Sequence, residues 1–307
     1  MPWRPLFRRL STPVSRAAPD GAAGLAVPVG EARSAAGGAA TIFHRRTPLA
    51  GRLGRFARIV VHLVGGLATT AFVFPRVSPR RRQALIARWS RQFLHMLHVE
   101  PRYRWHHDGG LAGNVLIVAN HVSWLDIMVL NTLRPARFIA KAELRRWPVA
   151  GRMFVNVGTL FIDRGKRSDT HSVNRHTVEA LSRGDVVAVF PEGTTSDGRG
   201  LLKFHSSLLQ PIVDAEGYVQ PAVIRYRTPD GEHSDVPAYC GGLTFLGSFW
   251  QVTGERKLVA ELHLLPPLAA RGAHRRALSA ATAEAIRTVL ESAASVPAPG
   301  RRAGRRA

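Results

Sequence analysis

Short, continuously apolar runs separated by helical or polar segments fill the chain from about residue 112 onward. Runs of this length are typical of strands buried on both faces. Between two of them, residues 168–183 have a helical apolar pattern that stops at Gly184. Strands spaced by helices predict an α/β domain with a mostly parallel central sheet flanked by helices. The apolar runs cover residues 114–119, 137–140, 158–162, 185–190 and 219–224.

Two helices of a different character precede these runs. Residues 59–74 form the most apolar stretch of the chain; at ~1.5 Å per residue they span about 24 Å, less than the roughly 30 Å hydrocarbon core of a bilayer. Residues 80–99 follow with an amphipathic pattern that includes Trp89 and several arginines. The pair predicts a membrane dock that dips into one leaflet or crosses it, and two core helices of a soluble domain are the alternative.

These patterns divide the chain into four segments. Residues 1–45, rich in Ala, Gly, Pro, Ser and Arg, are expected to be disordered and lack the apolar core of a secretory signal. Residues 46–100 are the predicted two-helix dock, and residues 101–292 are the predicted α/β domain, which ends in a helix over 273–291. Residues 293–307 are expected to be a disordered basic tail.

The charge of the chain leaves several partner classes open. The 43 Lys and Arg residues outnumber 21 Asp and Glu residues, giving a net charge of +22. A basic surface suits nucleic acid, an anionic membrane or an acidic soluble partner. A nucleic-acid-binding protein would show a basic stripe with interleaved aromatics or a known module, whereas here arginines are spread throughout. The single cysteine, Cys240, excludes an intramolecular disulfide framework.

The first candidate site directly follows the apolar run ending at Ala119. The sequence Asn120-His121-Val-Ser-Trp-Leu-Asp126 stands where a strand meets a helix, and open α/β sheets carry their reactive groups at such points. If the turn brings the two side chains together, the Asp126 carboxylate orients the His121 imidazole as a general base. A histidine that only caps the helix is the alternative.

Two further candidates follow other runs. The loop Phe190-Pro-Glu192-Gly193-Thr194-Thr195-Ser-Asp-Gly offers backbone N–H groups and hydroxyls that suit an anionic oxygen; Glu192 there either orients the loop or binds substrate, and a plain surface turn is the alternative. The run 158–162 leads into Arg164 and Lys166, a basic cluster that also suits an anion.

Taken in order, these blocks resemble the lysophospholipid acyltransferases of the 1-acylglycerol-3-phosphate acyltransferase type. Residues 120–126 resemble the family's catalytic block, 158–164 its second, 190–196 its third, and Val219-Gln-Pro221-Ala its fourth. The resemblance covers roughly residues 50–270, the two-helix dock included. It implies an enzyme on the cytoplasmic face of a bacterial inner membrane, with no metal or redox cofactor.

The resemblance also implies roles for individual residues. His121 would remove the proton from a lysophospholipid hydroxyl, Asp126 would orient the imidazole, and the alkoxide would attack the thioester of acyl-CoA or acyl-carrier protein. A backbone N–H is expected to stabilise the oxyanion. Arg164 would be the main anion contact. The residues expected to line the acceptor site are Phe161, Ile162, Glu192, Gly193, Thr194, Thr195 and Pro221. Asn120, Ser123 and Lys166 are expected to support the site.

One position departs from the family pattern. The third block usually reads Glu-Gly-Thr-Arg, and that arginine is associated with the acceptor phosphate, but Thr195 stands there in this chain. The expected phosphate clamp is therefore weaker. If the acceptor is 1-acylglycerol-3-phosphate, we expect Arg164, Lys166 or Arg199 to replace the family arginine. Alternatively, the acceptor is another monoacyl lipid such as lyso-ornithine lipid. A catalytically inactive membrane-binding relative is disfavoured because His121 and Asp126 are both present.

Overall fold

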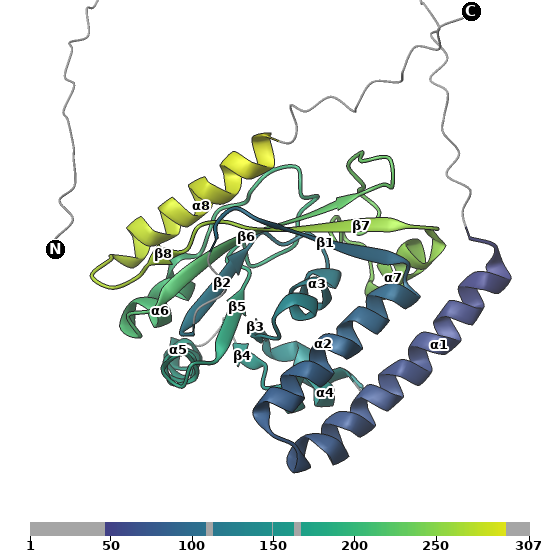
Figure 1. The fold of residues 1–307 in the computed structure, drawn as a ribbon, viewed down its shortest axis with the longest axis horizontal. Coiled ribbons are helices and arrows are strands. Elements are labelled where there is room, and N and C mark those ends of the chain that lie inside the picture. The colour runs from purple at the N-terminus through teal and green to yellow at the C-terminus, as the bar shows by residue number, and fades with distance from the viewer. Residues whose placement is uncertain (1–46, 109–112, 149, 163–166, 293–307) are drawn as a thin grey trace, which may run out of the picture. The chain divides into compact units, whose positions relative to one another are not determined.

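The computed structural model describes residues 47–108, 113–148, 150–162 and 167–292. The predicted terminal segments, residues 1–45 and 293–307, lie outside the described residues. The remainder is an eight-stranded sheet with helices on both faces (Figure 1). The predicted α/β fold with a mostly parallel sheet flanked by helices is confirmed.

The sheet has the strand order β1-β7-β6-β2-β5-β3-β4, with β8 paired to β6. Strands β6, β2, β5, β3 and β4 are parallel, whereas β7 and β8 run antiparallel to β6, and β1 runs parallel to β7. The predicted apolar runs supply the five parallel strands. The strands are β1 Val99–Trp105, β2 Val115–Ala119, β3 Arg137–Lys141, β4 Leu160–Ile162, β5 Val186–Val189, β6 Tyr218–Arg227, β7 Leu258–Leu264 and β8 Leu268–Ala269.

Helices cover the two faces of this sheet because alternate strand residues point to opposite sides. Ile117, Ala119 and Ile224 pack with residues of α2 and α3 in one core cluster. Leu116 and Val118 face the other way and pack with residues of α5, α6 and α8. The helices are α1 Leu49–Ala68, α2 Pro79–Met96, α3 Leu125–Leu133, α4 Ala150–Asn156, α5 Arg167–Ser182, α6 Gln210–Asp214, α7 Phe245–Gly254 and α8 Arg275–Ser292.

The two predicted N-terminal helices are α1 and α2. A π turn, Thr69–Val73, and a 3-10 turn, Phe74–Arg76, extend α1. The polar His62 within the apolar run is satisfied by α2, because its Nε2 lies 3.1 Å from the Trp89 carbonyl oxygen and the Trp89 Nε1 donates to the His62 carbonyl at 3.2 Å. Only 17% of the most apolar window of Leu49–Arg76 is buried. The helix is thus held to the domain along one face and leaves the other exposed.

The segment after the third block is a loop. Residues 201–205 have no regular secondary structure and are followed by the short 3-10 turn Ser206–Leu209. Two backbone amides of this segment are bound elsewhere: Leu202 N donates to the Glu192 carboxylate at 2.9 Å, and His205 N donates to the Pro191 carbonyl at 2.9 Å. These bonds hold the loop against the third block.

Candidate active site

The site begins where β2 ends. The buried side chain of Asn120 extends the pairing of β2 with β6 by one residue: its Nδ2 donates to the Ile224 carbonyl at 3.0 Å, and its Oδ1 accepts from Ile224 N at 2.8 Å. Because an amide side chain matches a backbone peptide in donors and acceptors, it ties the chain to the sheet while the backbone turns toward α3. Asn120 thereby positions the backbone of His121.

His121 and Asp126 meet across the turn that begins α3. The His121 Nδ1 donates to the Asp126 Oδ2 at 2.8 Å, and that oxygen also accepts from the backbone amides of Val122 at 2.8 Å and Ser123 at 2.9 Å. The carboxylate is fully buried, whereas the His121 side chain is 20% exposed. A proton held on Nδ1 by the carboxylate leaves Nε2 as the basic nitrogen.

The second oxygen of Asp126 is held by a residue of β6. The buried hydroxyl of Tyr226 donates to the Asp126 Oδ1 at 2.7 Å. Burial, together with the neighbouring negative charge of Asp126, raises the pKa of Tyr226 well above its ordinary value, so the phenol keeps its proton. All four bonds to the carboxylate come from groups fixed by the fold, and the carboxylate therefore has one orientation.

We predict that Tyr226→Phe lowers kcat roughly three- to tenfold and the free energy of unfolding by about 1–3 kcal/mol, because a buried acceptor loses one partner. The KM for the acceptor should change little, since Tyr226 lies behind Asp126. Steady-state kinetics and denaturant unfolding measure both. An unchanged kcat with reduced stability would mean that Tyr226 acts only on folding.

An aromatic ring of the third block covers the imidazole. The ring of Phe190 lies parallel to that of His121, with centroids 4.0 Å apart and an angle of 9° between the planes. Phe138 of β3 is in turn stacked with Phe190, with centroids 6.1 Å apart and an angle of 18° between the planes. The stack restricts rotation of the imidazole and shields one of its faces from water.

The same loop binds both backbone groups of His121. The buried Glu192 accepts from His121 N at 2.7 Å through Oε1 and from Leu202 N at 2.9 Å through Oε2. Ser196 N donates to the His121 carbonyl at 2.9 Å. Burial raises the pKa of Glu192, and the two amide bonds oppose that shift. Of the two roles considered for Glu192, these contacts match the one that orients the loop.

Glu192→Gln distinguishes orientation from substrate binding. The amide can accept from only one of the two backbone N–H groups and sets its NH₂ against the other. We expect kcat to fall roughly tenfold through displacement of His121 while KM stays near its original value. Steady-state kinetics with varied acceptor give the answer, and a raised KM at constant kcat would favour direct contact with the acceptor instead.

Thr195 is bound to a neighbouring loop. Its hydroxyl donates to the carbonyl of Tyr239, whose own N–H donates to the Val122 carbonyl at 2.9 Å. Thr194 is exposed, and Gly193 adopts a left-handed φ of 72° that favours glycine. At the position where the family has its arginine, this chain therefore has a side chain that fastens the third block to residues near His121.

The remaining predicted residues are placed less directly. Phe161 and the buried Ile162 lie on the edge strand β4, and Arg164 and Lys166 lie outside the described residues. Pro221 is buried within β6 beside Val118, before the strand end. It is five residues from Tyr226 and so points to the opposite face of the sheet. The structure does not bring Pro221 to the group around His121, and its contact with substrate stays a prediction.

Of the basic residues suggested as replacements for the family arginine, Arg199 is already bound to a carboxylate. Arg199 Nη2 donates to the Asp235 carboxylate at 2.8 Å, and Asp235 also binds His233 Nε2 at 2.9 Å. Arg199 is therefore already paired. No group of three or more His, Cys, Asp or Glu that could hold a metal occurs among the residues that the structure describes.

Sequence reasoning missed Tyr226 and Phe190 as partners of the His–Asp pair. Tyr226 lies 100 residues from Asp126 in the chain, and nothing local marks it. One signal was available: Tyr226 follows the buried run of β6 and lies on the same face of the strand as Ile224, whose backbone binds Asn120. A tyrosine hydroxyl that is buried on the α3-facing side of a central strand needs a hydrogen-bond partner there.

The chain has relatives among known proteins. A family model described as Acyltransferase matches residues 97–225. The chain is 39% identical to the 1-acyl-sn-glycerol-3-phosphate acyltransferase of Neisseria gonorrhoeae over 184 residues, 59% of this chain and 71% of that protein. It is 40% identical to the lyso-ornithine lipid O-acyltransferase of Pseudomonas aeruginosa over 192 residues, 62% of this chain and 72% of that protein.

A solved structure has a similar fold. The crystal structure of the 1-acyl-sn-glycerophosphate acyltransferase from Thermotoga maritima aligns with a TM-score of 0.64 at 20% identity and covers 82% of this chain and 98% of that one.

Proposed function

Because the chain belongs to the acyltransferase family that acts on lysophospholipids, we propose that it acylates the free hydroxyl of 1-acylglycerol-3-phosphate. The product is phosphatidic acid, and the acyl donor is acyl-CoA or acyl-carrier protein. The observation that carries the proposal is the His121 imidazole bound at 2.8 Å to a fully buried Asp126 carboxylate, while the His121 side chain is 20% exposed.

The proposed reaction uses these groups in sequence. His121 Nε2 takes the hydroxyl proton as the acceptor oxygen attacks the thioester carbonyl, and Asp126 stabilises the imidazolium that forms. The tetrahedral intermediate then collapses, the C–S bond breaks, and the imidazolium returns its proton to the leaving thiolate. A backbone N–H is proposed to stabilise the oxyanion. The thioester is itself the activated group, so no metal or redox cofactor enters the proposal.

Lyso-ornithine lipid is the alternative acceptor. It is favoured by Thr195, whose hydroxyl binds the Tyr239 carbonyl in place of a phosphate-binding arginine, and by the similarity to a lyso-ornithine lipid O-acyltransferase. The chemistry at His121 would be the same. Only the head-group contacts would differ.

An acyl-transfer assay decides between the acceptors. Purified full-length protein in detergent is given 1-acylglycerol-3-phosphate or lyso-ornithine lipid, each with acyl-CoA and with acyl-carrier protein, and kcat/KM is measured for all four pairs. The proposal requires the highest value with 1-acylglycerol-3-phosphate. A higher value with lyso-ornithine lipid selects the alternative, and turnover of neither contradicts both.

The place of action follows from the substrates and from α1. Lysophospholipids reside in membranes, and α1 presents an apolar exposed side flanked by arginines. We place the enzyme on anionic lipid at the cytoplasmic face of a bacterial inner membrane, where both acyl donors occur. Fractionation of cells carrying the full-length protein tests this, and a soluble fraction that retains the protein would contradict it.

A further inference from the structure

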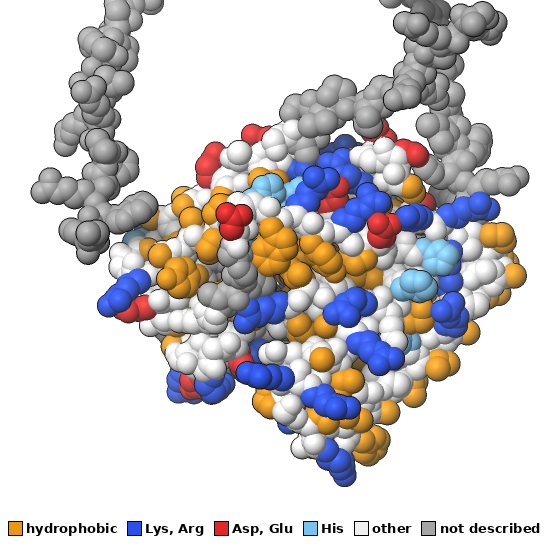
Figure 2. All heavy atoms as spheres, in the orientation of Figure 1, with side chains coloured by type: hydrophobic (Ala, Val, Ile, Leu, Met, Phe, Trp, Pro, Cys, Tyr) orange, Lys and Arg blue, Asp and Glu red, His pale blue; other side chains and the backbone are white. Residues whose placement is uncertain are grey.

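The exposed side of α1 carries a continuous apolar stripe. Its members recur at intervals of three and four residues, which places them on one face of the helix, and each is between 42% and 61% exposed. Figure 2 shows hydrophobic side chains, with Lys and Arg among them, along the edge formed by α1. The stripe consists of Leu49, Leu53, Phe56, Val60 and Val64.

Helix α7, almost 200 residues later in the chain, continues this stripe. Leu246 is 70% exposed and Trp250, one turn later, is 40% exposed. The adjacent Phe249 packs edge-on against Phe56 of α1, with ring centroids 6.0 Å apart. The apolar surface therefore passes from one helix to the other at Phe56.

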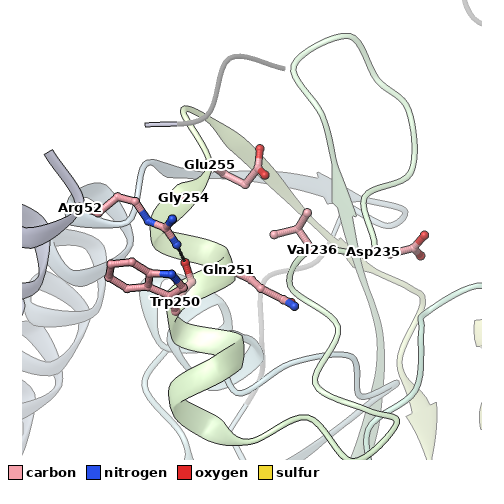
Figure 3. Close-up of a pocket in the computed structure, with 7 residues that line it drawn as sticks. All are labelled: Arg52, Asp235, Val236, Trp250, Gln251, Gly254 and Glu255. Carbon is pink, nitrogen blue, oxygen red and sulfur yellow. Dashed lines mark hydrogen bonds between the residues drawn. The ribbon is translucent and has the colours of Figure 1, made fainter. Parts of the chain in front are cut away.

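An arginine joins the two helices at the same place. The guanidinium of Arg52 lies 3.7 Å from the centroid of the Trp250 ring and donates to the Trp250 carbonyl (Figure 3). The two residues line a cavity of about 340 Å³. Tryptophan with an adjacent basic residue is the pair that proteins place at the level of lipid head groups.

Hydrogen bonds to backbone carbonyls at the end of α7 fix the relative position of α1 and α7. The buried Arg55 donates to the carbonyls of Thr253 at 2.9 Å and Glu255 at 2.6 Å. Thr47 N donates to the Gly254 carbonyl at 2.8 Å. The helices thus present one surface to a partner rather than two independent ones.

We infer that α7 is part of the membrane-binding surface, with Leu246 and Trp250 entering the interfacial layer of an anionic bilayer beside α1. The inference rests on the proposed membrane docking of α1. Neither helix contains Asp or Glu, whereas α1 carries Arg52 and the exposed Arg58 in addition to the buried Arg55, and the positive charge of Arg52 and Arg58 complements anionic head groups. A second copy bound through the same face would bring those arginines together, so lipid is the better occupant.

Vesicle binding tests the contribution of α7. Full-length protein is sedimented with vesicles of phosphatidylcholine and phosphatidylglycerol, and the partition coefficient is measured. Leu246→Glu should lower it roughly tenfold, because one leucine leaves the apolar layer. Tyr218→Glu is the control: it removes an exposed large side chain, 45% exposed against 70% for Leu246, and adds the same charge at the start of β6, remote from α1 and α7, and should bind as wild type.

A second measurement locates Trp250 directly. Lipids with brominated acyl chains should quench part of the tryptophan fluorescence of the wild type. Trp250→Phe should reduce the quenched fraction, while Trp105→Phe, which removes a similarly exposed ring on β1, should raise it. Both substitutions keep an aromatic ring, so neither depends on tolerance of a charge.

The outcomes separate this inference from the proposed function. Wild-type partition for Leu246→Glu, while Val64→Glu in the stripe of α1 loses binding, would overturn the role of α7 and leave docking by α1 intact. A wild-type dimer that Leu246→Glu dissociates, with unchanged vesicle binding, would assign the surface to a second copy. Absence of wild-type binding would overturn both membrane statements, whereas acyl transfer in detergent is measured independently of either.

Discussion

We expect His121→Ala to lower kcat by about three orders of magnitude, because it removes the group proposed to take the proton from the acceptor hydroxyl. Positioned acid–base groups contribute roughly 10²–10⁴-fold, and the firm hold on this imidazole argues against the lower end of that range. Phe190 stacks on its ring, Asp126 fixes Nδ1, and Glu192 and Ser196 bind its backbone.

The fold should survive this substitution. Asp126 keeps three of its four hydrogen-bond donors, from Val122 N, Ser123 N and the Tyr226 hydroxyl. Circular dichroism and denaturant unfolding establish that the variant is folded before kcat is compared. His176→Ala removes an exposed histidine of α5 and should have wild-type kcat. If His121→Ala keeps more than a tenth of wild-type kcat, proton removal by His121 is wrong.

The family was predicted from the order of four motif blocks and is confirmed by the relatives. The spacing of His121 and Asp126 alone left a helix-capping histidine equally open. Their contact depends on a turn in which the carboxylate also binds the amides of Val122 and Ser123. That turn is local, so the pairing could be anticipated. The bond from Tyr226 is not local, because it requires β6 to lie beside β2.

The fold was predictable where burial shapes the sequence. The apolar runs became the five parallel strands, and the helix expected at 168–183 is α5, Arg167–Ser182. β1 had no such signal. It is an edge strand whose residues after Val99 are partly or fully exposed, and its pairing with β7 involves residues about 160 positions away. Long-range pairing of a solvated strand leaves little trace in local periodicity.

The role of the carboxylate charge is tested by Asp126→Asn. The substituted amide can keep its oxygen at the position of Oδ2, where it accepts from His121 Nδ1 and from the amides of Val122 and Ser123. Its NH₂ then faces the Tyr226 hydroxyl, which can accept as well as donate. With the amide reversed, its NH₂ group would face three hydrogen-bond donors and could bond to none of them. The geometry is therefore preserved while the negative charge is lost.

We expect Asp126→Asn to lower kcat roughly 10²-fold, about 2.7 kcal/mol of transition-state stabilisation, because the imidazolium loses its counter-charge. The KM for the acceptor should stay within about twofold, since Asp126 is fully buried behind His121. ¹⁵N NMR of the labelled histidine should show the proton still on Nδ1, as the three donors require. A kcat within threefold of wild type, with that tautomer retained, would show that Asp126 orients the imidazole without stabilising its charge.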